Sequence, residues 1–187
     1  MKNYLIATAL LSAASLAAAD SLGLSGSYTK GFYRADGESL DFDGAFGVGL
    51  SYTYDLDSVS AVRTQLELFP NLYGSDKLGF GGEFTYLRSV TSTGGADVYV
   101  GGGLGLNTVS ASGATDAGRI TARLTTISPT LLAGVRYAVA PGFSGFFELA
   151  GGPSFLRASV SGGSATVSDT ATGAFLKPSI GFTYTIR

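Results

Sequence analysis

Residues 40–56 read LDFDGAFGVGLSYTYDL, and the character of the side chain changes at almost every step. The even positions, from Leu40 to Leu56, are mostly large and apolar, whereas the odd positions, from Asp41 to Asp55, are small or polar. A period of two over so long a stretch predicts a β-strand with one apolar face and one face of small and polar groups.

The same alternation recurs along most of the chain. We expect strands at 22–33, 40–54, 61–72, 77–87, 97–108, 129–139, 143–155 and 174–186. Each stretch is long enough for a tilted strand to cross a bilayer. The sequence therefore predicts an all-β fold, an antiparallel up-and-down barrel of eight transmembrane strands over residues 20–187.

Composition indicates which face of the barrel meets lipid. Of the 187 residues only 12 are Lys or Arg and 14 are Asp or Glu, about half the charged share of a soluble domain. The polar face is mostly Gly, Ser, Ala and Thr, which suits a narrow interior, so the apolar face is expected to lie in lipid. A soluble ligand-carrying barrel such as a lipocalin is the alternative, but its bulky residues would face inward and its charges outward.

Residues 1–19 have the pattern of a cleavable signal peptide. Lys2 precedes an apolar run over 4–16, and the alanines at 17–19 before Asp20 form a small-x-small cleavage site. A membrane anchor is the alternative, although the run is short and rich in Ala and Ser. We expect the mature chain to start near Asp20.

Connection lengths predict the orientation in the membrane. With the N-terminus on the periplasmic side, the external connections are 34–39, 73–76, 109–128 and 156–173, and the periplasmic ones are 55–60, 88–96 and 140–142. The two longest connections then lie outside, as in outer-membrane barrels. An interfacial aromatic girdle is expected at the periplasmic strand ends, although the strand propensity of aromatic residues also favours such a pattern; its members are Tyr52, Tyr54, Tyr86, Tyr137, Phe143 and Tyr184.

Six charged residues fall on the inward face and are expected to form a lumen charge network: Arg63, Glu67, Glu83, Arg136, Glu148 and Lys177. A hairpin centred on 73–77 places Glu67 directly across from Glu83, so either a cation from another strand lies between them or one carboxyl keeps its proton. Arg136 falls diagonal to Glu148, which predicts an ion pair. The network is either a gate or proton-bearing dyad in a pore, or a plug that satisfies the interior.

The residues that are missing exclude most enzyme chemistry. His, Cys and Trp are all absent, which removes His-based triads, thiol nucleophiles, Cys/His zinc sites and disulfides. The glycine run at 101–105 lacks the spacing of a nucleotide-binding loop and is expected to make room for interior partners. We expect no catalytic activity, no cofactor, no metal site and no nucleic-acid partner.

Residues 179–186 read SIGFTYTI, and with the eight expected strands they resemble the small outer-membrane barrels of the OmpA transmembrane-domain, OmpX and OmpW type. The resemblance covers the whole chain after the leader. It implies a cell outer-membrane location, lipid as a partner, and a C-terminal assembly signal at Gly181, Tyr184 and Ile186 for the barrel assembly machinery. Family members usually finish on an aromatic residue, whereas this chain finishes on Arg187. Lipid-modifying barrels depend on a His that this chain lacks.

The two long external connections are expected to extend the barrel wall as hairpins. Residues 159–168 alternate around a Gly-Gly pair, and in the other connection the phase slips near Thr125-Thr126, where we expect a bulge. Raised strand edges capture extended segments of other proteins, so adhesion or partner capture by a monomeric barrel is the expected role. The alternatives are a hydrophilic cap and a narrow channel for small solutes or ions.

Overall fold

A computed structural model describes residues 20–35, 37–115, 118–162 and 165–186. The predicted leader, residues 1–19, and the terminal Arg187 lie outside the described residues. Within the described part, no helix is long and apolar enough to cross a membrane.

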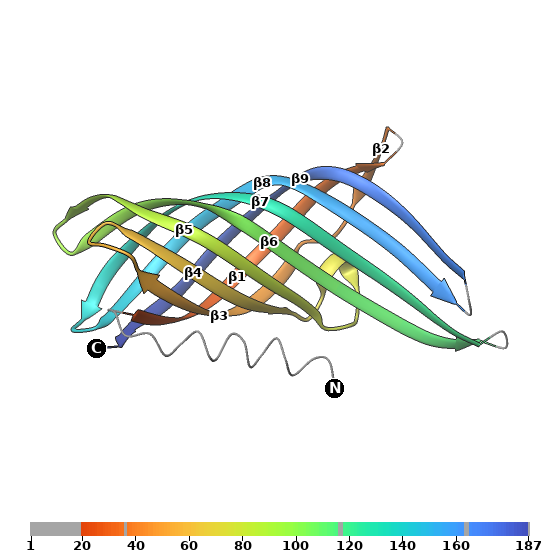
Figure 1. The fold of residues 1–187 in the computed structure, drawn as a ribbon, viewed down its shortest axis with the longest axis horizontal. Helices are drawn as coiled ribbons and strands as arrows, with labels where there is room; N and C mark the ends of the chain where they lie inside the picture. The colour runs from red at the N-terminus through yellow and green to blue at the C-terminus, as the bar shows by residue number, and fades with distance from the viewer. Residues whose placement is uncertain (1–19, 36, 116–117, 163–164, 187) are drawn as a thin grey trace.

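Nine antiparallel strands form one sheet that closes on itself (Figure 1). They are β1 (Asp20–Ala35), β2 (Glu38–Asp41), β3 (Ala45–Asp55), β4 (Ser60–Phe69), β5 (Gly79–Thr93), β6 (Ala96–Thr115), β7 (Gly118–Ala140), β8 (Phe143–Gly162) and β9 (Ala165–Ile186), with a 3-10 turn, η2 (Leu72–Gly74), between β4 and β5. β2 and β3 pair in succession with the same edge of β1, so the wall consists of eight strands and the predicted fold class is confirmed.

The ring closes where the first strand meets the last. β1 pairs with β9 from Asp20 opposite Ile186 to Arg34 opposite Thr172. An open edge in lipid would leave a row of N–H and C=O groups unpaired, at a cost of several kcal/mol for each group. Closure removes that edge, which is the physical reason for the barrel.

Two predicted strands are shorter than the alternation suggested. The stretch 40–54 breaks at residues 42–44. There the side chain of Asn71 makes hydrogen bonds that a neighbouring strand would otherwise make: its Nδ2 donates to Gly44 O at 3.3 Å, and its Oδ1 accepts from Phe46 N at 3.2 Å. The third strand ends at Phe69. Leu72, which falls in the apolar, lipid-facing phase of the predicted strand 61–72, is 1% exposed and packs inside the barrel.

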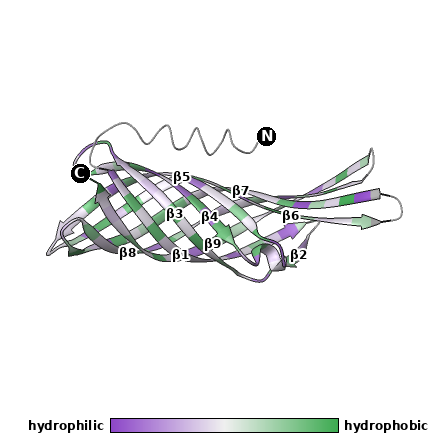
Figure 2. Cartoon of the chain, turned by 90° about the horizontal axis from the view of Figure 1, so that it is seen from below, coloured by the Kyte–Doolittle hydropathy of each residue, from purple (hydrophilic) through white to green (hydrophobic). Residues whose placement is uncertain are grey.

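Exposure alternates along the wall as the sequence predicted. In β3 the outward side chains are apolar, with Phe46 at 66% and Val48 at 57% exposure, while Ser51 and Thr53 are buried inside. Figure 2 shows hydrophobic and hydrophilic residues alternating along the strands of the wall. A broad apolar outer face with polar groups sealed inside is the reverse of a soluble barrel, so the soluble alternative is wrong for this chain.

The strands β6, β7, β8 and β9 rise well beyond the others at the end away from Asp20 and Ile186 (Figure 2). We call this the hairpin end, the opposite end the terminal end, and residues 109–115, 118–125, 157–162 and 165–170 the platform. Pairing of β7 with β6 and β8 continues without a shift from 120 to 127, so the bulge expected at Thr125-Thr126 is absent.

Along β7 the apolar residues change from the outward face to the inward face, while the pairing of the strand continues unbroken. In the apolar band, the part of the outer face that is expected to lie in lipid, Ile127 and Leu131 face outward. On the platform, Arg119 and Arg123 face outward and Leu124 packs inside. Above the band water replaces lipid, so polar residues belong outside and apolar ones inside. The change from lipid to water around the strand explains why the alternation of the sequence looks shifted near Thr125-Thr126.

Short turns close the terminal end. In the turn between β3 and β4, the carboxylate of Asp57 accepts from the N–H groups of Val59 and Ser60, both at 2.8 Å. The first of these hydrogen bonds is the main reason why the pKa of Asp57 lies below its usual value. The longer hairpins thus stand at the end opposite the termini, and the orientation in the membrane stays a prediction.

The first prediction tests whether the apolar face lies in lipid. Val48 pairs with Gly26 and Leu68 in the middle of that face, so Val48→Lys should lower the free energy of unfolding by about 2 to 4 kcal/mol in lipid vesicles. Ser168→Lys, on the platform, should change it by less than about 0.5 kcal/mol. Equal effects of the two substitutions would show that Val48 is in water.

Candidate functional site

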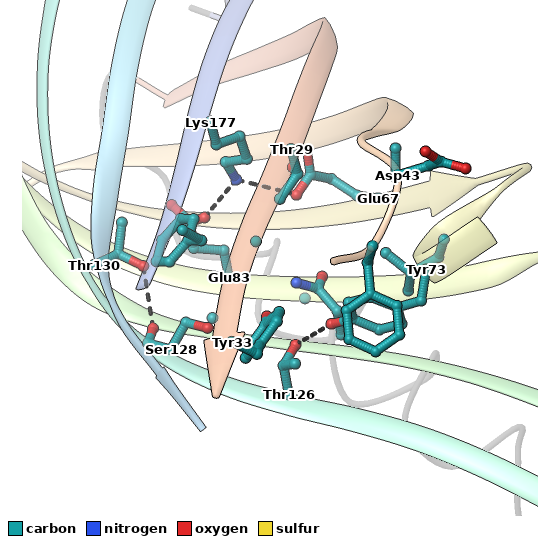
Figure 3. A pocket seen from close by; sticks show the side chains of 18 residues that line it. Thr29, Tyr33, Asp43, Glu67, Tyr73, Glu83, Thr126, Ser128, Thr130 and Lys177 are labelled. Atoms are coloured by element: carbon teal, nitrogen blue, oxygen red, sulfur yellow. Dashed lines mark hydrogen bonds and ion pairs between the residues drawn. The ribbon is translucent and has the colours of Figure 1, made fainter. Parts of the chain in front are cut away.

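Lys177 holds two acidic residues together at the centre of the interior (Figure 3). Its Nζ lies 2.6 Å from Oε2 of Glu83 and 3.1 Å from Oε2 of Glu67, and all three side chains are buried. The second carboxylate oxygens accept from Ser27 Oγ and Thr85 Oγ1, each at 2.9 Å. Every carboxylate oxygen therefore has a partner, as buried charges require.

The register between the two acids differs from the prediction. Glu83 faces Gln65, and Glu67 faces Gly81, so the carboxylates are diagonal rather than directly opposite. The centre of the hairpin lies nearer the N-terminus than predicted, and Leu72, which was expected in the strand, lies in the connection and turns inward. The sequence allowed two ways to keep two glutamates close together: a cation between them or a retained proton. The structure shows the first, because Lys177 from another strand lies between them.

A second ion pair lies nearer the terminal end. Arg63 Nη1 and Nη2 donate to Glu148 Oε1 and Oε2 at 2.5 and 3.0 Å, and the hydroxyl of Tyr99 donates to Oε1 at 2.7 Å. The expected pair of Arg136 with Glu148 is therefore wrong, although the register that suggested it is right, since Arg136 faces Phe146. The fork of Arg63 reaches across the lumen and matches the carboxylate with two parallel hydrogen bonds.

Arg136 instead pairs with a residue that sequence reasoning missed. Its Nη2 lies 2.8 Å from Oδ2 of Asp97, which is directly opposite on β6, and its guanidinium lies 5.8 Å from the centre of the Tyr99 ring. Asp97 is the first residue of its predicted strand, 97–108, directly after the predicted connection 88–96. Its position two residues before Tyr99, in the same inward phase, was the available signal.

Apolar side chains pack beside these charges and fill part of the lumen, while Arg63 and Arg136 still border a cavity at the terminal end. Toward the terminal end the apolar layer consists of Leu87, Tyr99, Leu132, Phe146 and Ala150, and toward the hairpin end of Tyr33, Ala45, Phe69, Leu72, Val109, Leu156 and Ala171. The expectation of a lumen lined mostly by small side chains is therefore incomplete. The cavity beside Lys177 is small, about 30 Å³, and one at the terminal end measures about 140 Å³.

An aromatic group covers the smaller cavity. The rings of Tyr33, Phe42 and Tyr73 meet edge to face, with Phe42 and Tyr73 5.5 Å apart, and the Tyr73 hydroxyl lies 2.6 Å from Thr126 Oγ1. Burial raises the pKa of Tyr73 above its usual value. Tyr73 has a φ of 57°, a left-handed conformation that a bulky residue rarely adopts, so these contacts hold it in place.

Comparison with known proteins gives a match at the level of the fold. No protein-family model matches the chain, and no curated protein matches it. The solid-state NMR structure of the outer membrane protein AlkL in DMPC lipid bilayers has a TM-score of 0.58 at 15% identity, covering 92% of this chain and 94% of that one. This chain has the fold of a small outer-membrane β-barrel.

Two further structures of outer-membrane barrels agree. The crystal structure of Neisserial surface protein A has a TM-score of 0.52 at 14% identity, covering 88% of this chain and 97% of that one. The crystal structure of a major outer membrane protein from Thermus thermophilus has a TM-score of 0.51 at 13% identity, covering 88% and 99%. The resemblance to small outer-membrane barrels is thus shown for the fold.

All six expected girdle residues lie on the outward face of the barrel at the terminal end. Tyr184 pairs with Leu22 and Phe143, and Leu22 pairs with Tyr52. The hydroxyl of Tyr52 donates to Asp20. Tyr54, Tyr86 and Tyr137 occupy outward positions on their own strands. Their role as an interfacial belt stays a prediction.

The expected assembly signal lies on the last strand of the barrel. Tyr184 and Ile186 face outward, while Gly181 faces inward, where a Cβ atom would collide with Leu24 O and lie 2.6 Å from the ring of Phe146. The glycine therefore has a packing reason of its own, and recognition by the assembly machinery stays a prediction. Among the described residues, no group of three His, Cys, Asp or Glu side chains is placed to hold a metal ion.

The second prediction concerns the buried cation. Lys177→Met leaves two buried carboxylates without it and should lower the free energy of unfolding by about 3 to 5 kcal/mol. Arg136→Met should lower it by less than about 1 kcal/mol, because the side chain of Arg136 is 37% exposed and water reaches the pair.

Urea unfolding in lipid vesicles measures both effects. Adding Glu67→Gln and Glu83→Gln to Lys177→Met should restore part of the loss, since no unpaired charge then remains. Equal losses for Lys177→Met and Arg136→Met would contradict a dry central pair.

The third prediction concerns the clearance around Tyr99. A Cβ on Gly134 would lie 2.6 Å from the Tyr99 ring and 2.8 Å from Glu148 Cγ, so Gly134→Ala should lower the free energy of unfolding by about 1 to 3 kcal/mol. Gly102→Ala is the matched control, because its Cβ meets nothing closer than 3.6 Å. Similar unfolding curves for the two variants would mean that the Tyr99 layer is loosely packed.

Proposed function

We propose that this protein is a non-conducting barrel of the outer membrane that uses its platform to capture an extended segment of another cell-surface protein. The barrel supplies a rigid and closed base. The platform supplies strands that stand clear of the apolar band. The observation that carries the proposal is an unpaired strand edge on the platform.

That edge belongs to β6. The pairing of β5 with β6 ends at Phe80 opposite Thr108, and among the described residues β6 pairs only with β7 from Val109 to Thr115. One side of this segment therefore presents N–H and C=O groups to water. An added antiparallel strand would continue the position of β5.

The chemistry of the β6 edge favours addition of a strand. Its residues 109–115 read VSASGAT, with no charge and no proline, so the usual devices that protect an edge are missing. The opposite edge, on β9, carries Asp169. The inner face of the platform adds apolar contact area, since Val160 is 50% and Val167 73% exposed.

A narrow channel for small solutes or ions is the competing function. The cavity at the terminal end is lined by Asp55, Asp57 and Arg136, but it also borders Arg63 and Tyr99, which contribute to the charged and apolar layers above it. These layers support a closed barrel rather than a continuous water path.

The fourth prediction tests conduction. Purified barrel in planar lipid bilayers should show no discrete current steps, because apolar side chains and the buried ion pairs of Lys177 and Arg63 occupy the lumen. Reproducible single-channel openings would instead favour the narrow-channel function.

The fifth prediction tests capture at the β6 edge. Bacteria that display the barrel should bind a monolayer of epithelial cells, and binding should fall about tenfold when Ser110 and Ser112 are both changed to Lys, since lysines on an edge oppose strand addition. The same change at Ser159 and Ser161, on a strand that is paired on both sides, should leave binding unchanged. Protease treatment of the monolayer should abolish binding, and equal binding by both double variants would contradict the proposal.

A further inference from the structure

A groove runs over β9 on the outer surface of the barrel, close to the hairpin end. Its floor is made by the small residues Thr172 and Ala174, and its walls by Phe32 on β1 and Phe155 on β8, which are 57% and 51% exposed. The groove has a volume of about 930 Å³. It differs from the interior site, because it opens toward the surroundings of the barrel.

The register sets the shape of the groove. Ala174 pairs with Phe32 on one side and Pro153 on the other, and Thr172 pairs with Arg34 and Phe155. The two rings therefore stand diagonally across a slot two strand spacings wide, roughly 10 Å. Small side chains between large ones leave room for a slender apolar group.

Cations surround the upper end of this slot. Arg34 lines it, and Arg157 stands two residues beyond Phe155 on the same outward face. Lys30 lines the lower part of the slot, opposite Leu176, and donates from Nζ to Phe42 O at 2.6 Å. Among the described residues, outward positions of β1, β7, β8 and β9 from Lys30 to the hairpin end carry no acidic residue; the two acidic residues of β2, Glu38 and Asp41, pair with the edge of β1 that faces away from β9.

The location of the groove selects the kind of occupant. Below the groove the outward face is apolar: Leu176 follows Ala174 on β9, and Ile127 pairs with Phe155. At this level β1, β8 and β9 are paired with one another on the wall. A peptide in this place would find no main-chain partners and would leave its own N–H and C=O groups unpaired in hydrocarbon. An acyl chain has no such groups, and a phosphate at its head would meet arginine, which binds phosphate well.

We propose that this groove binds a phosphate-bearing acyl lipid of the outer leaflet. One acyl chain lies over Ala174 between Phe32 and Phe155, and the phosphate lies against Arg34 and Arg157. The proposal does not depend on partner capture by the platform, and the two are tested separately.

The test uses the absence of tryptophan from the chain. Phe155→Trp places one fluorophore in the wall of the groove, and barrels are reconstituted in phosphatidylcholine vesicles with a small fraction of brominated phosphatidic acid or brominated phosphatidylcholine. Brominated phosphatidic acid should quench the groove tryptophan with about tenfold higher apparent affinity, as expected for two arginines near a phosphate. Phe84→Trp, on the outward face of β5, should be quenched equally by both lipids.

Charge variants in the Phe155→Trp background decide between a site and general attraction. Changing Arg34 and Arg157 to Gln should remove the preference for phosphatidic acid, while changing Lys77 and Arg119 to Gln removes the same charge and should keep it. Heat-modifiable gel mobility confirms that each variant is folded. Equal quenching by both lipids in the parent, or loss of the preference in the Lys77 and Arg119 variant, would overturn the proposal.

Discussion

The structure depends on one constraint: a peptide group in hydrocarbon has no water to bind, so every strand in the band needs a partner on both sides. The pairing of β1 with β9 meets that requirement by closing the sheet. Closure at eight strands leaves an interior that side chains can fill. A filled interior in turn leaves each inward charge in need of a partner within the barrel, which is why the lumen holds ion pairs among its apolar side chains.

The sequence predicted the wall well because alternation is a local signal. Which residues face outward, such as Phe46 or Val48, follows from strand phase alone. The partners of the inward charges do not follow, because Lys177 meets Glu67 and Glu83, and Arg63 meets Glu148, across the lumen between strands that are not hydrogen-bonded to each other. Hairpin reasoning reaches only neighbouring strands, and so it assigned Glu148 to the nearer Arg136.

Two further differences from the sequence analysis have local causes. Asn71 replaces part of the β3–β4 pairing with its side-chain amide, so the stretch 40–54 breaks where its alternation is intact. In β7 the change from apolar to polar outward residues looks like a slip in phase, yet the pairing is continuous. The alternation of apolar and polar residues depends on the medium that each face of the strand meets as well as on strand geometry. Above the band the outward face meets water instead of lipid.

The continuous register of the platform makes the height of this barrel adjustable. Because each strand repeats its faces every second residue, lengthening a hairpin by two residues on both of its strands would raise its tip by about 7 Å and leave every facing direction unchanged. Inserting an odd number of residues on each strand between the band and Arg123 would turn Arg123 and its neighbours inward and expose Leu124. Related chains can therefore differ in the height of their hairpins above the membrane by steps of two residues per strand, with the membrane-spanning part of the wall unchanged.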